Sequence, residues 1–128
     1  MNNIAPPNWA RKILISVCDR YEIKDYPTLV WKAKNNHDSS GITYFLKGQM
    51  IVRAGYDKQD QKRVLLHELA HIITNQGHTS IFWDTAIDLF KHYKLPDHFI
   101  INKEGDYRKG FLKAWRRRLD RKKARHLP

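Results

Sequence analysis

An apolar segment with helical periodicity contains the pattern His-Glu-x-x-His, and this pattern constrains the chain more than any other feature. It occupies positions 67–71 within residues 63–73, with His67 and His71 as its two histidines. Positions i and i+4 lie on one face of a helix, so both imidazoles can point at one metal ion. Glu68 lies about 100° around the helix from His67, beside such an ion rather than on it. The spacing therefore predicts a metal-binding helix.

Two histidines beside a glutamate are the side chains that a zinc hydrolase uses. Zinc lowers the pKa of a bound water, and a neighbouring carboxylate accepts the proton of that water. The motif predicts His67 and His71 as zinc ligands and Glu68 as the general base. The alternative is a buried, metal-free helix with two incidental histidines, because a short motif is only a hypothesis about function.

A catalytic zinc ion usually has three protein ligands and a water, so the motif needs a third ligand. The candidates are an acidic residue, His78, His92, His98 or His126. We favour His78, because it follows His71 by seven residues and comes directly after Gly77, where the chain can reverse. Asp84 and His98 are the alternatives, and Asp84 would otherwise hydrogen-bond a ligand imidazole.

Three short runs carry a resemblance to a known family. They are His67-Glu68-Leu69-Ala70-His71, Gly77-His78 and Phe82-Trp83. These runs resemble small HExxH…H metallopeptidases, including SprT-like and WLM proteases and short phage-encoded or bacterial relatives. In that pattern, a histidine beside a glycine is the third ligand, and a following aromatic residue packs the next helix against the active helix. The resemblance covers residues 10–93 and implies a minimal zincin fold. The sequence lacks the four-cysteine zinc ribbon of many SprT-like proteins, so a reduced relative is expected.

The segment before the motif predicts a helix and a small sheet. The predicted elements are a flexible arm over residues 1–7, a helix over 8–21, a strand over 28–34 and a hairpin of strands 42–46 and 49–53. Asn8 is the expected helix cap, and Gly48 is expected to supply a positive φ in the hairpin turn. The apolar stripe of the first helix consists of Trp9, Ile13, Val17 and Tyr21. We expect an α+β fold with a three-stranded, mostly antiparallel sheet.

The zinc motif and the segment after it predict further helices. The motif helix is expected to begin at Asp57 or Asp60, to run to about Asn75 and to end with Gly77. A helix over 81–93 follows, capped by Thr79 or Ser80, with an apolar face of Phe82, Ala86, Leu89, Phe90 and Tyr93. Residues 97–106 predict a loop with a short helix. The expected domains are a metallopeptidase domain over 1–106 and a basic amphipathic helix and tail over 107–128, with the helix at 107–125.

The net charge of +11 is concentrated near the C-terminus. Ten cations and one acid, Asp120, lie between positions 108 and 125 and contribute +9 of this charge. The cations are Arg108, Lys109, Lys113, Arg116, Arg117, Arg118, Arg121, Lys122, Lys123 and Arg125. One interpretation is a nucleic-acid contact through phosphates. The other is a solvated face that aids solubility or meets an acidic partner.

The motif predicts a zinc-dependent metallopeptidase that cleaves a protein or peptide substrate. With the basic segment, this substrate could be a protein bound to nucleic acid. One alternative is a non-catalytic, zinc-stabilised nucleic-acid-binding module, and another is a regulatory protease that acts on a repressor. The strand over 49–53 could be an edge that pairs with substrate, or an ordinary paired strand. The candidate oxyanion donors are Tyr44, Tyr56, Tyr93 and Tyr107.

Composition bears on the cellular compartment. Cys18 is the only cysteine in the sequence and falls in the first predicted helix, so a buried free thiol and a reducing compartment are expected. The N-terminus has no signal-peptide pattern, and no apolar run approaches the ~18 residues of a membrane helix. We expect a cytoplasmic protein without membrane contact, in the host cytoplasm if a phage encodes it.

Overall fold

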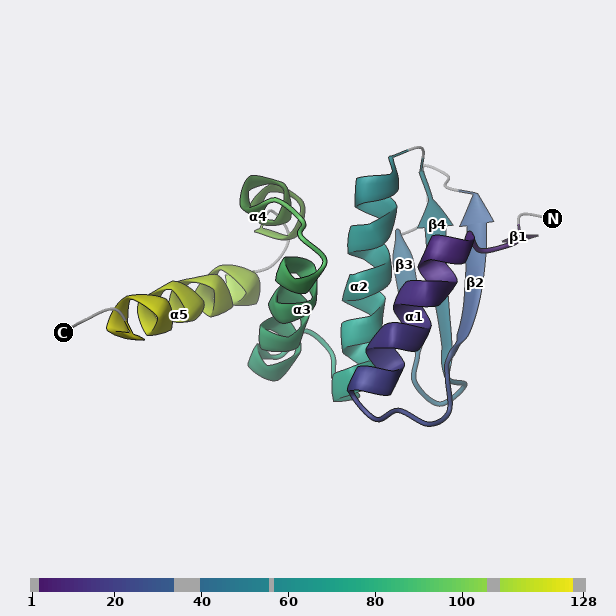
Figure 1. Ribbon diagram of the computed structural model, residues 1–128, viewed down its shortest axis with the longest axis horizontal. Helices are drawn as coiled ribbons and strands as arrows, with labels where there is room; N and C mark the ends of the chain where they lie inside the picture. The colour runs from purple at the N-terminus through teal and green to yellow at the C-terminus, as the bar shows by residue number, and fades with distance from the viewer. Residues whose placement is uncertain (1–2, 34–39, 56, 106–108, 126–128) are drawn as a thin grey trace. The chain divides into compact units, whose positions relative to one another are not determined.

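The computed structural model shows an α+β chain with five α-helices and four short strands in the part that it describes. The described residues are 3–33, 40–55, 57–105 and 109–125. The chain divides into two compact units, Met1–Asn75 and Gln76–Pro128. Figure 1 labels the elements from the purple N-terminal strand to the yellow C-terminal helix.

The first unit combines a sheet with two helices. Its elements are β1 (Asn3–Ile4), α1 (Asn8–Arg20), β2 (Thr28–Ala33), β3 (Gly41–Tyr44), β4 (Gln49–Ala54) and α2 (Lys58–Thr74). The strand order is β1-β2-β4-β3, so β4 is internal and β3 is an edge. β2 and β4 run parallel with Val30 opposite Ile51, whereas the β1–β2 and β3–β4 pairs are antiparallel. Figure 1 shows α1 in front of the sheet, with α2 beside it.

The predicted hairpin is confirmed, but the sheet is mixed rather than mostly antiparallel. β3 and β4 form the hairpin, and Gly48 in its turn has a φ of 58°, which favours glycine. The parallel β2–β4 pair was not expected, because it joins strands that are not neighbours in the sequence. Strand β1 replaces part of the expected flexible arm. The strand over 49–53 is not an open edge, since β4 pairs on both sides.

Apolar side chains at helical spacing pack α1 into the first unit. Ile13 and Val17 are buried, as their place in the predicted stripe requires. Trp9 is half-buried and meets Trp31 of β2 edge to face, with ring centroids 5.8 Å apart. Burying one large apolar side chain contributes roughly 1.5–3 kcal/mol, so Ile13 and Val17 stabilise the packing of α1 within the first unit.

Cys18 is the buried, free thiol that the sequence predicts. Burial, and to a lesser extent the charge of Asp19, raises the pKa of the thiol from 9.0 to about 11. Reactive and metal-binding cysteines act as thiolates, and little thiolate exists at neutral pH when the pKa is this high. Cys18 is therefore a packing residue of α1.

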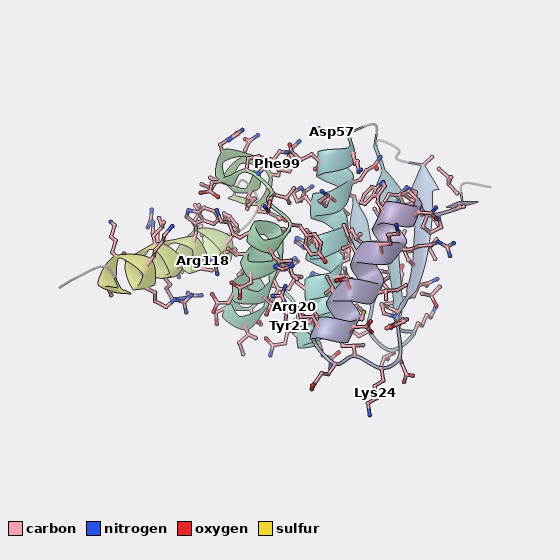
Figure 2. All side chains as sticks on the ribbon, in the orientation of Figure 1. Arg20, Tyr21, Lys24, Asp57, Phe99 and Arg118 are labelled. Atoms are coloured by element: carbon pink, nitrogen blue, oxygen red, sulfur yellow. The ribbon has the colours of Figure 1, made fainter. Side chains whose placement is uncertain are left out.

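The ends of helix α2 have specific chemical causes. The side chain of Asp57 accepts a hydrogen bond from the backbone N–H of Gln59 at 2.9 Å and caps the N-terminus. Figure 2 labels Asp57 at that end of the helix. Asn75 ends the helix in the left-handed conformation, with φ 53°. The helix thus ends close to the predicted position of about Asn75, but the left-handed cap is Asn75 and not the predicted Gly77, because asparagine also tolerates this conformation. The predicted cap of α1 is also wrong, since Asn8 is already helical and Pro7 holds the cap position without a side-chain bond.

The second unit contains α3 (Ser80–His92), α4 (Asp97–Gly105) and α5 (Lys109–Arg125). Thr79 caps α3 by accepting a hydrogen bond from the N–H of Phe82, as predicted. The predicted face of α3 is buried at Phe82, Ala86, Leu89 and Phe90 and half-buried at Tyr93. The segment expected to be a loop with a short helix is helical from Asp97 to Gly105.

Helix α5 packs on α3 through aromatic side chains and a close backbone approach. The rings of Trp83 and Phe111 meet edge to face with centroids 5.4 Å apart. A Cβ at Gly110 would lie 3.1 Å from Nε1 of Trp83, so glycine permits this approach. Phe111 is fully buried, whereas Leu119 is 45% exposed. The packing of α5 is therefore concentrated in its N-terminal half. No described helix has the length and apolar character needed to span a bilayer.

Candidate metal centre

His67 and His71 lie on one face of α2, as their four-residue spacing requires. Their ring centroids are 5.1 Å apart. His71 is 6% exposed, and the ring of Phe45 meets it edge to face with centroids 6.0 Å apart. His67 is half-buried. The helix thus holds two imidazoles near each other, with the second restrained by an aromatic neighbour.

Glu68 is buried against the edge strand β3. Its side chain is 6% exposed, and Thr43 Oγ1 donates a hydrogen bond to Glu68 Oε1 at 2.7 Å. The same Oγ1 lies 3.4 Å from the backbone oxygen of Glu68. A Cβ at Gly41 would lie only 2.6 Å from Glu68 Oε2. The carboxylate therefore occupies space that exists because position 41 is glycine, and a strand hydroxyl orients it.

The chain after α2 brings His78 into reach of the helix. Asn75 reverses the chain through its left-handed conformation, and its N–H donates to the backbone oxygen of His71 at 2.8 Å. His78 follows three residues later, and three residues span at most ~10 Å. The His78 side chain is exposed, and its ring stacks on Trp83 with centroids 5.5 Å apart.

Three histidines have the arrangement of a candidate metal centre. The ligand nitrogens of His67, His71 and His78 all lie within 4.8 Å of one another. Within the described ranges, no other group of three His, Cys, Asp or Glu side chains meets this condition. Three imidazoles suit zinc, and they leave a fourth tetrahedral position for water or substrate. The donor set therefore fits a catalytic zinc ion better than a closed structural site.

The other candidate ligands lie elsewhere. His92 is exposed at the end of α3, beside the ring of Tyr93, and His98 is exposed on α4. Asp84 forms ion pairs with Arg117 and Arg121 of α5, at 3.4 and 3.8 Å, instead of bonding to an imidazole. His126, Tyr56, Tyr107 and Arg108 lie outside the described residues.

Thr43 and Gly41 are the site residues that sequence reasoning missed. Thr43 belongs to the predicted hairpin and Gly41 directly precedes it, both lie in the observed β3, and neither has a motif of its own. Their role depends on packing between β3 and α2, which are 25 residues apart at the Thr43–Glu68 contact. A glycine and a threonine two positions apart on one strand share a face, which is the only local signal available.

Comparisons with protein-family models, curated proteins and solved structures gave no match to this chain. Its function is therefore inferred from the chemistry of the candidate metal centre.

Proposed function

We propose that the protein is a zinc-dependent peptidase. The observation that carries the proposal is the approach of three histidine ligand atoms to within 4.8 Å, with Glu68 one residue after the first of them. If the two histidines of the helix were incidental, there would be no reason for a third histidine from outside the helix to lie beside them. There would also be no reason for a buried carboxylate to be held by a strand hydroxyl.

The proposed role of each group follows from the chemistry of its side chain. Bound zinc would supply Lewis-acid chemistry, polarising the scissile carbonyl and lowering the pKa of an attacking water toward ~7. Glu68 accepts the proton of that water at its carboxylate and delivers it to the leaving amine. Thr43 restrains the carboxylate through its hydrogen bond. Because β3 is the edge strand beside Glu68, it is the candidate for backbone pairing with an extended peptide.

A purely structural zinc module explains fewer of the observations. Structural zinc sites are usually four-coordinate and rich in cysteine. Cys18, the only cysteine in the sequence, is buried in α1 and is not part of the histidine group. Such a module would also have no use for a proton acceptor at Glu68.

The test is Glu68→Gln, which removes the proton acceptor and keeps the shape of the side chain. We expect the variant to retain zinc and to lose turnover of a mixture of synthetic peptides, followed by mass spectrometry. A general base contributes about 10²–10⁴-fold, so the loss should be at least 100-fold.

The chain offers a matched control in Glu22→Gln, because Glu22 is exposed in the turn after α1. This variant should keep wild-type turnover and zinc content. Undiminished turnover by the zinc-loaded Glu68→Gln protein would contradict the role of Glu68.

A further inference from the structure

Seven of the cations of α5 fall into two sets, which differ in whether the side chain pairs with an acid of α3. Arg117, Arg118 and Arg121 are paired with acids of α3. Asp84 forms ion pairs with Arg117 and Arg121, and Asp88 accepts a hydrogen bond from Arg118, which Figure 2 labels on α5. These three arginines therefore neutralise α3 within the second unit.

The second set forms a row on another face of the helix. Lys109, Lys113, Arg116 and Lys123 stand at positions i, i+4, i+7 and i+14, which share one face of an α-helix. All four are exposed, and none has an acidic partner within the described part of the chain. We call these four residues the basic stripe. It extends for about 21 Å at 1.5 Å per residue. Asp120 lies in the same row and lowers its net charge by one.

We propose that the basic stripe is a docking surface for the phosphate backbone of double-stranded DNA. A duplex carries one negative charge per ~1.7 Å of its axis, so a row of this length meets a dense line of phosphates. Contacts from lysine and arginine to phosphates carry no sequence information, so binding is independent of base sequence.

The packing of α5 argues against two other partners. A helix that binds a membrane surface buries a broad apolar face in the lipid. On α5, Phe111 and Ala114 are buried, which leaves Leu112 and Leu119 as its exposed large apolar side chains, too few for a broad apolar face. Single-stranded nucleic acid is usually held by exposed aromatic rings. The aromatic residues of α5 are Phe111, which is buried, and Trp115, which is half-buried beside it with ring centroids 5.7 Å apart.

The experiment compares two triple variants of the full chain. The stripe variant is Lys109→Gln, Lys113→Gln and Arg116→Gln, and the control is Arg117→Gln, Arg118→Gln and Arg121→Gln. Each removes three positive charges from the same helix. Binding of a fluorescein-labelled duplex is followed by anisotropy at about 50 and about 200 mM NaCl, because phosphate contacts release counterions.

We expect wild-type affinity to fall roughly 40-fold between the two salt concentrations, as about three net phosphate contacts predict. The stripe variant should bind at least ~10-fold more weakly at low salt and lose most of the salt dependence, whereas the control should stay within about 3-fold. Circular dichroism checks that both triple variants fold. If a triple variant unfolds, the single exposed substitution Lys113→Glu is compared with the wild type instead, and it should also bind the duplex more weakly at low salt.

Three results would overturn the proposal. They are no duplex binding by the wild type at low salt, an equal loss in both triple variants, and binding to anionic phospholipid vesicles or single strands in place of the duplex. Because the readout is binding alone, it stands or falls independently of peptidase activity.

Discussion

At Glu68, the proposed proton acceptor, the carboxylate is held by a strand residue 25 positions earlier in the chain. Thr43 donates to one carboxylate oxygen at 2.7 Å, and the bare backbone of Gly41 leaves room for the other. The approach of His67 to His71 could be predicted from the motif, because i and i+4 geometry is local. The contacts of Glu68 with β3 could not be predicted, because they arise only when the strand and the helix pack together.

Replacing Thr43 tests this support directly. Thr43→Val keeps the branched shape and removes the hydroxyl, so zinc content and folding should not change. A hydrogen bond to a charged group contributes about 1.5–3 kcal/mol, and we expect kcat/KM on the peptide mixture to fall at least ~10-fold. Thr43→Ser keeps the hydroxyl and should restore most of this activity. A serine variant as poor as the valine variant would show that the hydroxyl does not position Glu68.

Helix α2 is the element on which the candidate centre depends. Its extent, Lys58–Thr74, lies close to the extent predicted from Asp57 or Asp60 to about Asn75, because its caps and apolar spacing are local signals. The sheet was harder to predict. The β3–β4 hairpin is joined by a short turn and was predicted, whereas the parallel β2–β4 pair has no local signature. Whether the strand over 49–53 is an edge or a paired strand was left open by the sequence, and its pairing with both β2 and β3 makes it interior.

The cap at Asp57 gives a prediction for this element. Asp57→Ala leaves the N–H of Gln59 without its side-chain acceptor, and losing such a cap costs about 1 kcal/mol. We expect the melting temperature to fall by roughly 3–6 °C in a thermal scan followed by circular dichroism. Asp57→Asn keeps an acceptor oxygen and should melt near the wild type. If the asparagine and alanine variants lose equal stability, the side-chain cap does not stabilise α2.

At the scale of the whole molecule, the chain divides between Asn75 and Gln76. No low-complexity or proline-rich run marks this boundary in the sequence. In the structure, the boundary directly follows Asn75, whose backbone is left-handed. The two sequence motifs also fall in different units. The cations near the C-terminus belong to the second unit, whereas His67, Glu68 and His71 belong to the first. The sequence predicted both features as separate motifs, and it could not indicate which of the arginines are paired with Asp84 and Asp88.

The most direct test of the three-histidine centre is the zinc content of the purified full chain, measured by elemental analysis. His78→Ala is compared with the wild type, and His98→Ala is the matched control because His98 is exposed on α4 and outside the histidine group. We predict about one zinc per chain in the wild type and in His98→Ala, and loss or marked weakening of binding in His78→Ala, because the ion would keep two of its three protein ligands. Full zinc retention by His78→Ala would assign the third ligand elsewhere, as in a regulatory protease. A wild-type protein that neither contains zinc nor takes it up on addition would contradict the account.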